Sequence, residues 1–138
     1  MTDSQASAAQ LPDEILRDVP WRFWDAEPYA DRGEFEAAVS ALLVDLERPA
    51  EWRAGEIALR VPRVRILFFG VDSPDDDDYQ DFSVEVTSDD GVAFTRGELL
   101  HKVHNAVVLH LNAVDHCYFE GLKLENPAFP TYQMEQGS

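Results

Sequence analysis

Strand-like alternation between two helical segments is the feature that most constrains the fold of this sequence. Apolar and polar side chains alternate within residues 57–68 and again within 82–86, as expected of strands that bury one face. Asp90-Gly91 is a strong signal for a hairpin turn, and residues 117–135 predict one or two further strands. Strands joined by hairpins indicate a mainly antiparallel sheet.

The two flanking segments have the periodicity of amphipathic helices. Residues 32–47 place their apolar side chains on one stripe. A capping box at Thr95 and Glu98 begins the second helix, which is expected to run to about residue 114. The sequence therefore predicts an α+β fold, with a mainly antiparallel sheet of about four to six strands and two amphipathic helices. The alternative is a small, strongly bent, barrel-like sheet with flanking helices.

The length of 138 residues predicts one folded domain over residues 11–138, preceded by a disordered tail over residues 1–10. No apolar run approaches the ~20 residues that a membrane helix needs. The first residues lack the basic and apolar regions of a signal peptide, and Cys117 is a single cysteine. We therefore expect a cytoplasmic protein without a disulfide or a membrane span.

Charge is the main indication of function. The chain carries 27 acidic and 11 basic side chains, for a formal net charge of -16. Such a balance disfavours nucleic acid and anionic lipid as partners and favours a basic protein. Our leading hypothesis is a small acidic interaction domain without catalytic activity, for example an inhibitor or immunity-type binder of a basic protein. A homodimer is also left open by the sequence.

Three groups of residues are candidates for partner binding. Trp21 and Trp24 belong to an aromatic cluster, and tryptophan is enriched at interface hot spots. The run Asp75, Asp76, Asp77 and Asp78 would attract cations or a basic partner. Leu109 falls in the middle of the polar face of the second helix and predicts a second contact surface. Alternatively, the aromatic cluster covers one end of the core, the aspartate run is a solvated loop, and Leu109 is an isolated exposed leucine.

The histidines suggest a second hypothesis, a metal-binding protein or metal-dependent hydrolase. His101 and His104 are helix neighbours at i and i+3, and Asp115 or His116 would supply a further ligand. His110 falls on the opposite flank of the helix. The alternative is that His104 is a core histidine with one hydrogen-bond partner.

A third hypothesis, a small barrel-like nucleic-acid-binding module, would use Arg60, Arg63 and Arg65, but the net charge opposes it. The sequence contains no nucleophile elbow, phosphate-binding glycine loop or dinucleotide fingerprint. We therefore predict no cofactor and name no catalytic residue.

Overall fold

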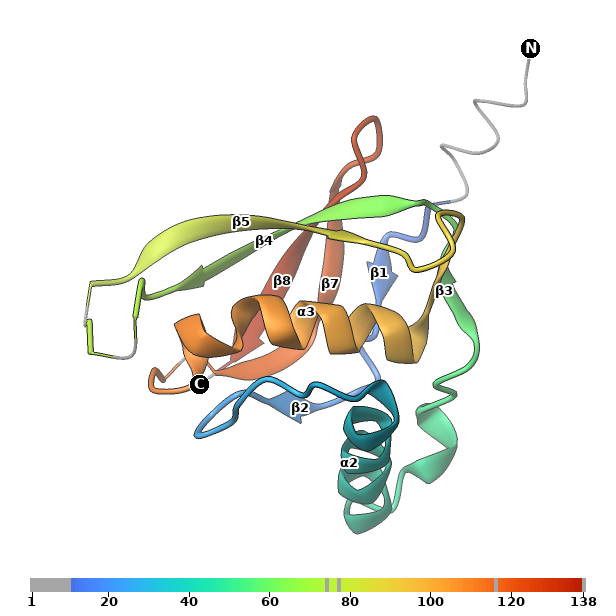
Figure 1. Ribbon diagram of the computed structural model, residues 1–138, viewed down its shortest axis with the longest axis horizontal. Coiled ribbons are helices and arrows are strands. Elements are labelled where there is room, and N and C mark those ends of the chain that lie inside the picture. Colours follow the sequence, from blue (N-terminus) through green and yellow to red (C-terminus); the bar gives the residue numbers. More distant parts are fainter. Residues whose placement is uncertain (1–10, 74, 77, 116, 138) are drawn as a thin grey trace.

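The computed structural model describes residues 11–73, 75–76, 78–115 and 117–137, so the predicted tail lies outside the described residues. Its elements follow in the order β1 (Glu14–Ile15), β2 (Trp21–Arg22), α2 (Arg32–Asp45), a 3-10 helix (Pro49–Glu51), β3 (Ile57–Leu59), β4 (Arg63–Gly70), β5 (Gln80–Thr87), β6 (Phe94–Thr95), α3 (Arg96–Leu111), β7 (Tyr118–Asn126) and β8 (Thr131–Gly137). The predicted α+β class is confirmed (Figure 1).

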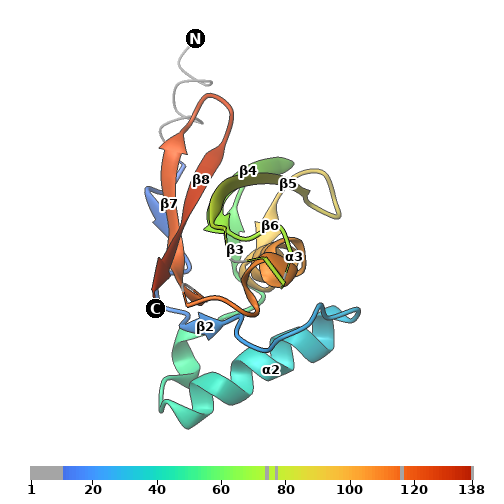
Figure 2. The same cartoon turned by 90° about the vertical axis from the view of Figure 1, so that its left-hand side faces the viewer.

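The main sheet has six strands, in the order β1-β7-β8-β4-β5, with β2 also paired to β7. All of these pairs are antiparallel except β4 and β8, which run parallel. β3 and β6 form a separate two-stranded pair, so the hairpin predicted at Asp90-Gly91 is wrong: the strand after this turn pairs with β3 and not with β5. Figure 2 shows β4 and β5 curving over α3, with the β7–β8 hairpin beside them. The sheet is thus strongly bent around one helix, and within the described residues it does not close into a barrel.

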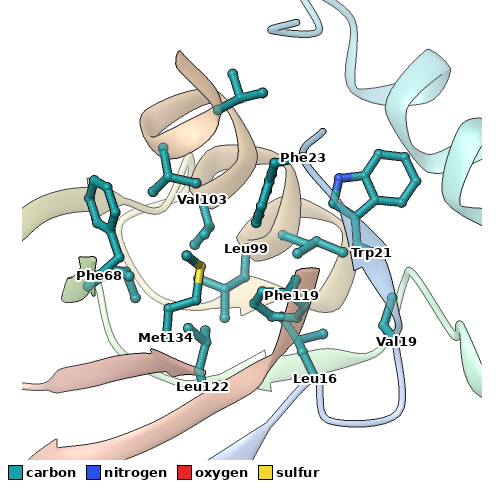
Figure 3. Close-up of a cluster of buried hydrophobic side chains, with 14 of the residues drawn as sticks. Leu16, Val19, Trp21, Phe23, Phe68, Leu99, Val103, Phe119, Leu122 and Met134 are labelled. Carbon is teal, nitrogen blue, oxygen red and sulfur yellow. The ribbon is translucent and has the colours of Figure 1, made fainter. Parts of the chain in front are cut away.

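Because the sheet curves around it, α3 is buried along most of its length. The side chain of Thr95 accepts a hydrogen bond from the backbone N–H of Glu98 at 3.0 Å, so the predicted helix start is correct. Leu99 and Val103 point into a core that also contains side chains from β2, β4, β7 and β8 (Figure 3). The apolar face predicted for this helix therefore forms the centre of the fold.

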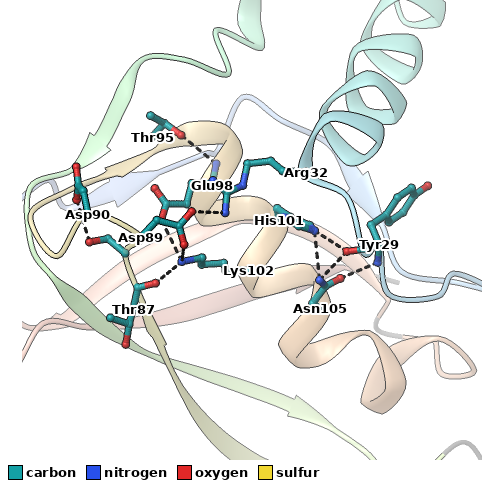
Figure 4. A network of polar contacts seen from close by, with 11 residues as sticks. Tyr29, Arg32, Thr87, Asp89, Asp90, Thr95, Glu98, His101, Lys102 and Asn105 are labelled. Carbon is teal, nitrogen blue, oxygen red and sulfur yellow. Dashed lines mark hydrogen bonds and ion pairs between the residues drawn. The ribbon is translucent and has the colours of Figure 1, made fainter.

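A network of charged side chains joins the start of α3 to the turn that follows β5 (Figure 4). Lys102 Nζ lies 2.8 Å from Asp89 Oδ1 and 3.1 Å from Glu98 Oε2, and it also donates to the carbonyl oxygen of Thr87. Arg32, the first residue of α2, reaches the other Asp89 oxygen at 2.8 Å. These contacts fix the N-terminal ends of both helices against the same turn.

Gly70, the last residue of β4, packs against the C-terminal end of α3. A Cβ at this position would lie 2.7 Å from the carbonyl oxygen of His110, a backbone atom that cannot move cheaply. We expect Gly70→Ala to lower the free energy of unfolding by about 1–3 kcal/mol, as measured by urea denaturation. Gly55→Ala is the matched control, because a Cβ there meets no atom within 4 Å. Equal losses in the two variants would contradict the close packing of β4 on α3.

Candidate functional site

Residues 20–29, which we call the aromatic strap, run between α3 and α2 (Figures 1 and 2). Only Trp21–Arg22 pair with the sheet, opposite Phe119 and Tyr118 of β7. Trp21 is buried, and its ring lies edge-on to Phe35 of α2 with the ring centroids 5.2 Å apart. Trp24 faces solvent with 49% of its surface exposed. The strap thus has an inner side that packs on the core and an outer side that is exposed to solvent.

His104 of α3 holds the strap at two points. Trp21 Nε1 donates to His104 Nδ1 at 3.0 Å, and His104 Nε2 lies 2.8 Å from the carbonyl oxygen of Glu27. Because Nδ1 accepts, the proton is on Nε2, which donates to Glu27. His104 is fully buried, and this desolvation lowers its pKa below the usual 6.5; the hydrogen bond to Glu27 partly opposes the shift, and nearby His101 adds a smaller lowering. The bonds therefore select one tautomer of a neutral imidazole.

Two more turns of α3 hold the strap backbone. Asn105 binds both backbone groups of Tyr29: its Oδ1 accepts from the N–H and its Nδ2 donates to the carbonyl, each at 2.9 Å (Figure 4). His101 Nε2 lies 2.7 Å from the same carbonyl oxygen. Further along the helix, Asn112 Nδ2 donates to the carbonyl oxygen of Ala26 at 3.1 Å. These side chains satisfy backbone groups that the irregular strap cannot pair within itself.

The predicted metal ligands His101 and His104 instead hydrogen-bond to the strap. Both ring nitrogens of His104 are hydrogen-bonded, so the expected core histidine has two partners rather than one. Asp115 is exposed, and its backbone N–H donates to Tyr79 Oη at 3.2 Å. His116 lies outside the described residues. Within those residues, no group of three or more His, Cys, Asp or Glu side chains could hold a metal ion.

Burial of His104 predicts that acid destabilises the protein. The unfolded chain takes up this proton near pH 6.5, whereas the folded protein resists it because the pKa is lowered. The free energy of unfolding should therefore fall below about pH 6.5, by at most about 1.4 kcal/mol per pH unit from this group. Urea denaturation between about pH 7.5 and pH 5 measures this slope, above the range in which carboxylates with ordinary or lowered pKa values titrate. His104→Leu should have a smaller slope, and an unchanged slope would contradict the assignment.

The outer side of the strap forms one wall of a groove of about 530 Å³, which we call the strap groove. Leu42 and Leu46, at the C-terminal end of α2, and Tyr118 of β7 also line this groove. The strap itself contributes Pro20, Trp21, Arg22, Trp24, Asp25, Ala26 and Tyr29. Leu46 is 46% exposed and Tyr118 is 42% exposed, so large apolar surfaces remain uncovered here.

A second hollow of about 400 Å³ lies on the other side of the exposed tryptophan. It is lined by Val114, Asp115 and Cys117 and shares Arg22, Trp24 and Tyr118 with the strap groove. These three shared residues, which we call the ridge, therefore separate the two hollows. Burial raises the pKa of the Cys117 thiol, so this cysteine is not an activated nucleophile.

The remaining predicted contact residues lie away from the strap groove. Asp75 and Asp78 are exposed on the loop between β4 and β5, which is at the opposite end of the molecule from α2 (Figure 1), and Asp76 is partly buried. Asp77 lies outside the described residues. Leu109 is 50% exposed on α3 and does not line either hollow.

The basic cluster on β4 and the residues before it is partly engaged within the chain. Arg65 lies 3.7 Å from Glu85 of β5, and its guanidinium carbon lies 4.3 Å from the centre of the Phe129 ring. Arg60 and Arg63 are exposed.

Comparisons with family models, with curated proteins and with solved structures find no match to this chain. None of its described helices has the length and apolar character needed to cross a membrane.

Proposed function

We propose that this protein is an acidic interaction domain without catalytic activity, and that it binds a basic protein on the face formed by the strap groove. The observation that carries the proposal is Trp24, half exposed on a ridge between two hollows. Its ridge neighbours are Arg22 and Tyr118, and tryptophan, arginine and tyrosine are the residue types most enriched at interface hot spots.

The charge of the chain supports a basic partner. A net charge of -16 attracts a cationic protein over a distance limited by the Debye length, about 8 Å at physiological salt. Long-range attraction of this kind raises the association rate, whereas the apolar groove supplies short-range contacts that slow dissociation. An inhibitor or immunity-type protein that neutralises a basic enzyme has these properties.

The test begins with affinity capture by the wild-type protein and by Trp24→Ala, with identification of proteins that only the wild type retains. Each candidate is then purified and its affinity measured at low and high salt. We expect a basic protein whose affinity falls at least about tenfold between 50 and 500 mM salt. A purified partner that is acidic, or an affinity that ignores ionic strength, would overturn the proposal.

A further inference from the structure

The two hollows adjoin at the ridge, and we call the surface that they form together the path. In the strap groove, the lining residue Leu46 is flanked in sequence by exposed Asp45 and Glu47. The ridge is shared by both hollows, and the second hollow is lined by Asp115. The path therefore carries exposed apolar side chains, with Asp45 and Glu47 next to a lining residue of one hollow and Asp115 in the lining of the other.

The carboxylates along this path are available to a partner. Asp45, Glu47 and Asp115 form no ion pair with any residue that the structure describes, and the same holds for Asp25 in the groove wall. Carboxylates that already face solvent lose little hydration when a lysine or arginine approaches them at the rim of an interface. They would therefore select cations at the two ends of a bound segment.

The middle of the path selects against a cation. Arg22 lies on the ridge between the hollows and, among the described residues, its guanidinium has no ion-pair partner. A lysine or arginine placed over the ridge would meet this like charge, which costs binding energy. By contrast, Arg22 can donate hydrogen bonds to backbone carbonyl oxygens of a segment that crosses it.

We propose that the occupant of this path is an extended segment of the basic partner, with Lys or Arg at both ends and a large apolar side chain between them. The apolar side chain enters the strap groove against Leu42, Leu46 and Trp24, and the two basic ends lie at Asp45/Glu47 and at Asp115. This inference rests on the proposed function and specifies which part of the partner is recognised. The charge of -16 disfavours a second copy of this chain as the occupant.

The test uses two fluorescein-labelled dodecapeptides of identical composition. One has two lysines at each end and leucine and phenylalanine in the centre, and its isomer has the lysines in the centre and the apolar residues at the ends. We expect the first peptide to bind at least about tenfold more tightly by fluorescence polarisation, a difference of about 1.4 kcal/mol. Trp24→Ala should remove most of that preference. Equal affinity of the two isomers, or no binding of either, would overturn the inference.

A pair of charge variants separates a local site from general attraction. Asp45→Asn/Glu47→Gln and Asp75→Asn/Asp78→Asn each remove two negative charges, but only the first pair flanks the strap groove. The first should weaken the peptide about tenfold, and the second less than about twofold. Equal effects would mean that no local recognition occurs.

The salt dependence of binding distinguishes the peptide complex from self-association of the protein. Self-association through the groove would strengthen as salt screens like charges, whereas the peptide complex should weaken. Dimer formation that blocks the peptide would therefore overturn the inference. If the peptides fail but a purified basic partner still binds with salt-sensitive affinity, the inference fails and the proposed function remains.

Discussion

Replacing His104 with leucine should lower the free energy of unfolding by about 2–4 kcal/mol at pH 7.5, a pH at which the native imidazole is neutral. Leucine fills a similar space but leaves the buried indole N–H of Trp21 and the carbonyl of Glu27 without their partner. A buried polar group without a partner costs about 1–3 kcal/mol. The measurement is urea denaturation followed by far-ultraviolet circular dichroism, so that the readout does not depend on the tryptophans.

A double variant tests whether the loss comes from the unsatisfied indole. Trp21→Phe removes the donor, so Trp21→Phe/His104→Leu should be less destabilised than the sum of the two single variants, by about 1 kcal/mol or more. Leu109→Ala, a change at an exposed position of the same helix, should alter stability by less than about 0.5 kcal/mol. Strict additivity of the His104 and Trp21 variants would argue against their hydrogen bond.

Replacing Arg96 with methionine should lower the free energy of unfolding by a similar amount, about 2–4 kcal/mol. Breaking a fully buried ion pair costs more, about 3–5 kcal/mol. The Arg96 side chain is 9% exposed and donates from Nε to the Trp52 carbonyl at 2.9 Å and from a terminal nitrogen to Asp18 Oδ1 at 2.7 Å. Asp18 is 29% exposed, so water offsets part of the loss. Burial opposes ionisation of Asp18, but the hydrogen bond and charge of Arg96 outweigh it and lower the pKa of that carboxyl.

Arg17→Met is the matched control for Arg96→Met. Arg17 also pairs with a carboxylate, Glu14, at 2.9 Å, but the two side chains are 60% and 38% exposed. An exposed pair of this kind contributes about 0–1 kcal/mol. We therefore expect Arg17→Met to be nearly as stable as the wild type by the same urea measurement. Similar losses in both arginine variants would contradict the structural role of Arg96.

The fold was predictable because local patterns and tertiary packing agree. The strand alternation and the helix-start signals are local, and each appears in the structure near its predicted position. The chain does turn at Asp90-Gly91, but the predicted hairpin does not form there, because the partner of β6 is β3, which is distant in sequence. The parallel pairing of β4 with β8 was not predictable, because it joins segments about sixty residues apart without a sequence signal. The choice between an open sheet and a barrel depended on the curvature around α3, which no short sequence motif encodes.

The candidate site was only partly predictable. The sequence identified the aromatic cluster and the histidine helix as separate candidates, and the structure brings them together, because His101 and His104 hold the strap. Asn105 and Asn112 of the same helix also bind the strap backbone, and they were not predicted from the sequence. The signal that could have identified them is their spacing of seven residues, which puts both amide side chains on the same face of the helix. Leu42, Leu46 and Tyr118 were missed because the groove depends on how α2 and β7 approach the strap.

The central claim is that a partner binds on the strap groove beside Trp24, while α3 holds the inner side of the strap in place. Its most direct test is a nuclear magnetic resonance titration of the three tryptophan indole N–H groups with the peptide that has lysines at both ends. Trp52 is buried, is hydrogen-bonded to the backbone of Glu36 and lines neither hollow, so its signal should barely move and serves as the reference. The Trp24 signal should shift saturably at the same peptide concentrations that change fluorescence polarisation. Saturable binding that leaves the Trp24 signal in place would contradict the account.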